Sequence, residues 1–229
     1  MSASEKVLIC KHSRSWSDDR CSQLLVNKGY QVDWCYPLEG EALPEPEAYR
    51  AAVIFGCRNS VNDPEAWIKS ELRWVEDCLK ADCPFLGLCF GGQLLARVLG
   101  AEVAEHQDSL TEIGFTEIFS TAEKMNCLSP PKKLFQWHRE GFDLPAGSSR
   151  LCSSERFPNQ AFRYGKHSYG LQFHPEVNHA VIQQWFSENE DHEPEGLDFA
   201  SRARQLVYAR QNDDAITEWF SGFIDNWLQ

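Results

Sequence analysis

The chain has 229 residues, of which 42% are hydrophobic and 24% charged, and this composition is typical of a folded globular protein. Its formal net charge of −12 argues against nucleic acid or an anionic membrane surface as a partner. Nine cysteines without CxxC or zinc-type spacing, no apolar run of membrane length and no signal-peptide pattern predict a cytoplasmic protein with free thiols, no metal and no other cofactor.

The first part of the chain alternates short apolar strands with amphipathic helices. We expect strands at 6–10, 30–36, 51–55 and 85–88, and helices at 18–28, 64–80 and from 90 onward. This alternation predicts an α/β fold with a doubly wound, mostly parallel sheet, whose active site lies beyond the carboxyl ends of the strands. Gly56 and Cys89 both follow such strand ends, so we expect them to meet in space.

The middle of the chain predicts a small antiparallel section, and the end predicts helices. Short strands are expected at 113–119, 133–137, 150–153, 161–164 and 168–176. A helix begins near 178, an acidic stretch at 187–195 reads as an exposed linker, and two helices follow at 197–210 and 213–228. The aromatic stripe of the last helix is more typical of core packing than of a partner surface. We expect one domain over 1–229, with a core at about 5–186 and a helical extension at about 187–229.

The chain is organised around Cys89, which stands between a buried strand and a helix and is bracketed by Gly87, Gly91 and Gly92. This pattern is typical of a nucleophile elbow, with cysteine in place of serine. The amides and the dipole at a helix N-terminus favour the thiolate form of such a cysteine. The amide of Phe90 is then expected to face a developing oxyanion. An inert buried thiol is the alternative.

His174 is the expected base for this thiol, and Glu176 the expected orienting group. Alternate side chains of an extended backbone point to the same side, and Pro175 restricts His174 to extended conformations. Glu176 would hold the imidazole while His174 exchanges a proton with the thiol and the leaving amine. A surface histidine in a turn is the alternative.

The segments 87–96 (GLCFGGQLLA) and 170–176 (GLQFHPE) resemble the two signatures of class I glutamine amidotransferases, in the same order of Cys, His and Glu. The resemblance covers about residues 5–186 and implies that family's flavodoxin-like fold. It also implies that Cys89 attacks the side-chain amide of glutamine, and that water hydrolyses the resulting γ-glutamyl thioester to glutamate. Oxyanion amides are implied at Phe90, Gly56 and Cys57, and substrate contacts at Gln93 and Gly114.

The chain departs from this family's pattern after Gly56. The family's oxyanion loop commonly has a second glycine and then a proline, where this chain has Cys57 and Arg58. Arg58 either binds a carboxylate of the substrate or is merely solvated, and both interpretations remain open. His138, in a weaker third motif, is either a second layer of the site or a hydrogen-bonded structural residue.

Two enzymatic hypotheses and one non-enzymatic hypothesis follow. Family members normally pass ammonia to a synthase, but no phosphate-cradling loop or second catalytic domain is evident here. The chain resembles the stand-alone branch that is similar to the amidotransferase portion of GMP synthase, which includes γ-glutamyl peptidases. The substrate is therefore glutamine, with ammonia passing to a separate synthase subunit, or a γ-glutamyl amide or peptide. A non-catalytic binding subunit is the third hypothesis, and a homodimer stays open.

Overall fold

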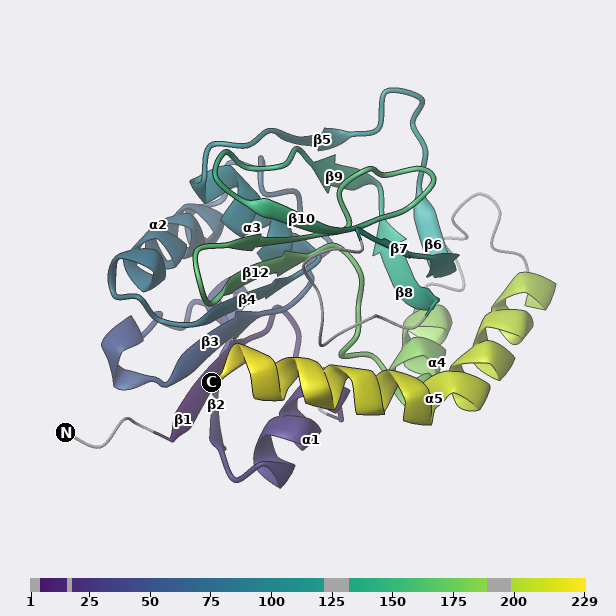
Figure 1. Cartoon of the computed structure of the whole chain (residues 1–229), viewed down its shortest axis with the longest axis horizontal. Helices are drawn as coiled ribbons and strands as arrows, with labels where there is room; N and C mark the ends of the chain where they lie inside the picture. Colours follow the sequence, from purple (N-terminus) through teal and green to yellow (C-terminus); the bar gives the residue numbers. More distant parts are fainter. Residues whose placement is uncertain (1–4, 16–17, 122–131, 189–198) are drawn as a thin grey trace.

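Figure 1 shows the computed structural model of the chain, which describes residues 5–15, 18–121, 132–188 and 199–229. A central eight-stranded sheet has the order β2-β1-β3-β4-β12-β11-β10-β7. The strands from β2 to β12 in this order are parallel, and the pairs from β12 to β7 are antiparallel. The predicted mostly parallel sheet with an antiparallel section is therefore confirmed. The strands of the sheet are β1 (Lys6–Cys10), β2 (Gln31–Cys35), β3 (Ala51–Ile54), β4 (Phe85–Leu88), β7 (Phe119–Ser120), β10 (Ser149–Ser153), β11 (Ala161–Tyr164) and β12 (Ser168–Leu171).

Two small antiparallel sheets accompany the central one. In the first, β5 (Val103–Glu105) pairs with β9 (Glu140–Phe142), a pairing that the sequence reasoning missed. In the second, β6 (Glu112–Glu117) pairs with β8 (Lys133–His138). The short 3₁₀ turns η1 (Pro37–Glu39) and η2 (Pro46–Ala48) lie between β2 and β3.

Helices cover both faces of the central sheet (Figure 1). Successive residues of a strand face opposite sides, so Val7 and Ile9 pack with α1 (Arg20–Asn27) and α5 (Phe199–Trp227). Leu8 and Cys10 instead pack in the cluster that includes α2 (Ala66–Lys80) and α3 (Phe90–Val98). The helix α4 (His179–Glu188) packs with α5 over a third, smaller cluster.

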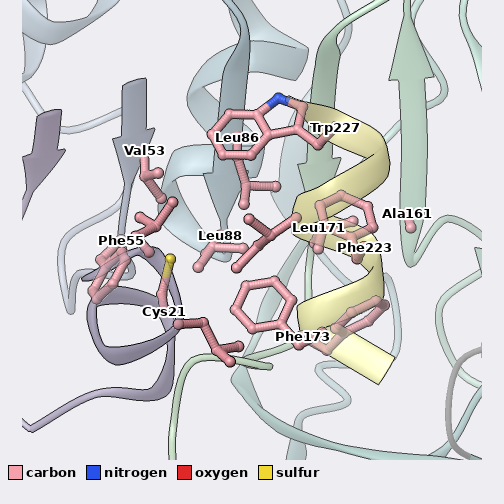
Figure 2. Packing of buried hydrophobic residues seen from close by; sticks show 14 of the residues in the cluster. Cys21, Val53, Phe55, Leu86, Leu88, Ala161, Leu171, Phe173, Phe223 and Trp227 are labelled. Carbon is pink, nitrogen blue, oxygen red and sulfur yellow. The ribbon is translucent and has the colours of Figure 1, made fainter. Parts of the chain in front are cut away.

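The carboxyl-terminal part of the chain forms one continuous helix, α5, and the prediction of two helices is wrong. The segment 211–213 contains residues of weak helix propensity but neither glycine nor proline, so nothing in the backbone ends the helix there. Phe220, Phe223 and Trp227 are buried against the sheet, as Figure 2 shows for the latter two. The aromatic stripe is therefore core packing, as predicted.

Two other predicted boundaries differ from the structure. The strand expected over 168–176 ends at Leu171, because the chain then turns away from β11 and the amide of His174 donates to the carbonyl of Phe135 in β8 over 2.8 Å. The first two residues of the expected acidic linker belong to α4, and its residues 189–195 lie outside the described residues.

Candidate active site

Cys89 occupies the sharp turn between β4 and α3, where the predicted strand, turn and helix are all present. Its backbone has φ 51° and ψ −107°, a conformation that L-residues rarely adopt and that costs about 1–3 kcal/mol. Gly91 makes room for the turn, since a Cβ at its position would lie 2.2 Å from the carbonyl oxygen of Ile54. The turn therefore holds Cys89, a residue that is 5% exposed, at the N-terminus of a helix.

His174 and Glu176 lie in the connection between β12 and α4, and both side chains are buried. Nδ1 of His174 donates to Oε1 of Glu176 over 2.7 Å, which leaves Nε2 as the ring nitrogen available to a thiol. Burial lowers the pKa of His174, but the charges of Glu176 and Cys89 outweigh burial and raise that pKa to about 10. The imidazole therefore keeps a proton at neutral pH that it can give to a leaving group.

Gly56 meets Cys89 at the carboxyl edge of the sheet, as the parallel topology predicts. A Cβ on Gly56 would lie 2.7 Å from Cε1 of His174 and 3.5 Å from Cβ of Cys89. The next side chain, Cys57, also lines the site, and burial raises the pKa of its thiol to about 11. Cys57 is therefore protonated at neutral pH and does not compete as a nucleophile.

Two buried glutamines connect the Cys89 sulfur to the wall of the site. Nε2 of Gln172 donates to Sγ of Cys89 over 3.6 Å. Nε2 of Gln93 donates to Oε1 of Gln172 over 3.2 Å and to the carbonyl of Glu140 over 3.0 Å. Gln93 thus directs the amide group of Gln172 toward the sulfur, and it does so through its side-chain nitrogen rather than its side-chain oxygen Oε1.

Cys89 and His174 open into a pocket of about 580 Å³, within the range of small-molecule sites. Arg58 is exposed at this pocket, and Thr111 and Ile113 line it as well. Gly114 is not among the lining residues, since a Cβ at its position would lie 2.6 Å from the side-chain amide of Gln205 in α5. A substrate contact at Gly114 stays a prediction that this geometry does not favour.

His138 lines the pocket and belongs to a buried polar network behind it. Its Nδ1 lies 2.9 Å from the carbonyl of Glu140, and its Nε2 lies 3.2 Å from Oε2 of Glu112. The Glu112 carboxylate also accepts hydrogen bonds from Ser154 and Gln160, each over 2.6 Å. His138 is thus a buried, hydrogen-bonded residue that also forms part of the pocket wall. It has features of both predicted roles, the structural residue and the second layer of the site.

The loop that carries Glu176 is held from behind by Arg20. The backbone amide of Arg20 donates to the carbonyl of Glu176 over 2.7 Å, and the guanidinium donates to the carbonyls of Pro175 and Val177. The same guanidinium forms an ion pair of 2.6 Å with Asp213 of α5. The C-terminal helix is therefore tied to the loop of the candidate site through one buried side chain.

Comparison with known proteins identifies the family. Residues 23–191 match the family model described as glutamine amidotransferase class-I. The chain belongs to the class I glutamine amidotransferases. This amidotransferase chain is 28% identical over 179 residues to the glutamine amidotransferase-like protein YfeJ of Salmonella typhimurium, which covers 73% of this chain and 71% of YfeJ.

The amidotransferase also resembles part of a larger synthase and an amidotransferase of known crystal structure. It is 27% identical over 191 residues to a glutamine-hydrolyzing GMP synthase of Azoarcus sp., covering 76% of this chain but only 36% of that synthase. The crystal structure of a glutamine amidotransferase from Thermotoga maritima has a TM-score of 0.88 at 28% identity, with 98% of each chain covered. The class I amidotransferase fold implied by the sequence resemblance is therefore confirmed.

Several side chains of the amidotransferase site were not singled out from the sequence. They are Gln172 at the Cys89 sulfur, Trp185 edge-on to His174 at 5.2 Å, and His12, which hydrogen-bonds Gly56. Only Gln172 had a local signal, since it lies two residues before His174 in the quoted motif.

Among residues 5–15, 18–121, 132–188 and 199–229, every helix is too short or too polar to span a membrane. Within the same residues, no group of three His, Cys, Asp or Glu side chains is placed to hold a metal ion.

Proposed function

We propose that this amidotransferase hydrolyses γ-glutamyl amide bonds, with Cys89 as nucleophile, His174 as acid and base, and Glu176 as the orienting carboxylate. The observation that carries the proposal is the buried 2.7 Å contact of His174 with Glu176 beside a thiol on a strained turn. A fold alone is no evidence for an activity, so the proposal rests on these side chains.

The geometry supports an acyl-transfer reaction in two steps, formation and then hydrolysis of a thioester. The Cys89 sulfur gives its proton to His174 and bonds to the γ-carbonyl carbon of the substrate, whose oxygen becomes an oxyanion facing the amides of Phe90 and of the Gly56–Cys57 loop. His174 protonates the nitrogen as its bond to carbon breaks, and ammonia or an amine leaves. Water then attacks the γ-glutamyl thioester, giving its proton to His174, and glutamate and the Cys89 thiol are released.

The pocket favours a substrate whose glutamyl group has a free α-ammonium group and a carboxylate nearby. The carbonyl oxygen of Gln93 is a suitable acceptor for the α-ammonium group, because the nitrogen of Gln93 is already engaged within the protein. The exposed guanidinium of Arg58 is suited to a carboxylate, either of the glutamyl group or of a γ-glutamyl peptide. Glutamine and γ-glutamyl amides or peptides are therefore the proposed substrate class.

A second candidate is glutamine hydrolysis with delivery of ammonia to a separate synthase subunit. It is favoured by the similarity to a GMP synthase that extends over only 36% of that protein's length. On this hypothesis turnover of glutamine alone is slow and rises when the synthase binds.

The test is glutamate release from glutamine and from a panel of γ-glutamyl peptides and amides. Cys89→Ala is the inactive control, and Cys152→Ala is its match, because Cys152 is an equally buried cysteine in β10 outside the pocket. Cleavage that depends on Cys89 but not on Cys152 supports the proposal. Equal turnover by Cys89→Ala and the wild type refutes the assignment of Cys89 as the nucleophile. If the wild type turns over none of the substrates, the protein is a binding subunit or lacks its synthase.

A further inference from the structure

His12 connects the end of β1 to the loop that follows β3. The strands β1 and β3 are parallel neighbours, so the residues just beyond them meet at the same edge of the sheet. His12 is nearly buried there, with Nδ1 at 3.2 Å from the carbonyl oxygen of Gly56. Its Nε2 lies 3.1 Å and 3.2 Å from the two carboxylate oxygens of Glu71, a fully buried residue of α2. The imidazole thus bridges a buried carboxylate and the backbone of Gly56.

The hydrogen-bond partners determine which ring nitrogen donates. A carbonyl oxygen can only accept, so the contact with Gly56 is favourable only when Nδ1 of His12 carries a hydrogen. The Glu71 carboxylate also accepts, so a hydrogen lies between its oxygens and Nε2. We assign a hydrogen to Nδ1 as well, because it makes both contacts of the ring favourable, and His12 then donates to the carbonyl of Gly56.

This hydrogen bond orients the peptide between Gly56 and Cys57. No described peptide bond is cis, and in a trans peptide the carbonyl and the following N–H point in opposite directions. The amide hydrogen of Cys57 therefore points away from His12, and it has no protein acceptor among the described residues. The His12 ring also packs edge-on against Phe90 at 5.1 Å, so it contacts both segments that carry the proposed oxyanion amides.

We propose that His12, held by Glu71, is a positioning residue that aims the Cys57 amide at the oxyanion, an inference that rests on the function proposed above. The loop reads Gly56-Cys57-Arg58, without a proline to restrict its backbone, so the hydrogen bond from His12 supplies a restraint. Donation to the carbonyl also polarises the peptide, which strengthens its N–H as a donor.

The test compares two double variants that both remove the buried ion pair. His12→Phe/Glu71→Leu keeps an aromatic ring against Phe90 but has no donor for the Gly56 carbonyl. His12→Asn/Glu71→Leu keeps an amide donor near the position of Nδ1. Because both lack the Glu71 carboxylate, neither leaves an unpaired buried charge, and thermal unfolding reports their folding.

Each variant is measured in three ways. Turnover of γ-L-glutamyl-p-nitroanilide gives kcat and KM. Affinity for glutaric semialdehyde reports the oxyanion site, because the Cys89 sulfur adds to the aldehyde carbon and leaves a tetrahedral oxygen there. The rate of Cys89 alkylation by iodoacetamide reports the thiol and His174 without using the oxyanion site.

We expect His12→Phe/Glu71→Leu to lose about 10- to 100-fold in kcat and in aldehyde affinity, with little change in KM or alkylation rate. This loss is smaller than the about 10²–10³-fold cost of removing an oxyanion donor, because the peptide itself remains. The His12→Asn/Glu71→Leu variant should recover most of the loss.

Three outcomes overturn the inference in different ways. If the wild type is active and both doubles retain its kcat and aldehyde affinity, His12 does not position the peptide. If kcat and the alkylation rate of a double variant fall together, the substitutions also disturb Cys89 and His174, and the loss is not specific to the oxyanion site. A wild type that neither turns over the anilide nor binds the aldehyde refutes the proposed function, and the inference with it.

Discussion

Substitution of Gly56 by alanine is the sharpest steric test of the proposed catalytic arrangement. The added Cβ would lie 2.7 Å from Cε1 of His174, whereas an ordinary contact begins at about 3.4 Å, so the ring must retreat by about 0.7 Å. The ring cannot rotate freely, because Glu176 holds Nδ1 at 2.7 Å and Trp185 packs edge-on at 5.2 Å.

The expected loss follows from the size of this displacement. A misplacement of about 1 Å costs on the order of 10²-fold in rate, so we expect Gly56→Ala to lower kcat about 10- to 100-fold. The rate of Cys89 alkylation by iodoacetamide should fall as well, because His174 moves away from the thiol that it activates. Both quantities are measured on protein whose folding is checked by thermal unfolding.

A matched glycine separates this steric effect from ordinary destabilisation. Gly29 has φ 89° and no atom within 4 Å of an added Cβ, so Gly29→Ala costs about 1–2 kcal/mol of stability and touches nothing in the site. It should retain wild-type kcat. Wild-type kcat and alkylation rate in Gly56→Ala would refute the placement of His174 against Gly56 in the working enzyme.

Three further predictions concern the charge, the sulfur and the core. Glu176→Gln removes one of the two charges that raise the pKa of His174 while burial still lowers it, so that pKa should fall below about 10 and the alkaline limb of kcat/KM should move to lower pH; an unchanged profile contradicts this. Gln172→Leu should slow alkylation of Cys89 about fivefold, since a hydrogen bond is worth about 1 kcal/mol; an unchanged rate excludes the contact. Phe223→Ala should lower the free energy of unfolding by about 3–5 kcal/mol in urea titrations, whereas a loss below about 1 kcal/mol would contradict its burial.

The C-terminal helix shows where local pattern fails. Its apolar spacing correctly placed Phe220 and Trp227 in the core, because helical periodicity is a local property of the chain. The same reasoning placed a break at 211–212, between helices expected over 197–210 and 213–228, yet the structure has one helix over Phe199–Trp227. Packing on both sides of this point favours continuity over local propensity, since Ala209 is buried in the cluster shared with α4 and Ile216 in the core cluster against the central sheet.

The features that could be predicted from the residues alone are those that depend on local backbone geometry. The turn at Cys89 requires a close approach of Gly91 to β3, and the alternation of strands and helices requires a parallel sheet whose strand ends converge. Each requirement is visible as a residue pattern within a short segment of the sequence. The histidine and glutamate of the second motif are likewise two residues apart, so their pairing is visible in the sequence.

The residues that support the site come together only through contacts between distant parts of the chain. His12 and Glu71 are 59 residues apart, and Gln172 and Cys89 are 83 apart. Each pair forms because separate elements pack at one edge of the sheet, and no periodicity or spacing marks the partners in advance. A buried carboxylate must find a partner somewhere in the fold, but which side chain fills that role depends on the packing of whole helices and strands.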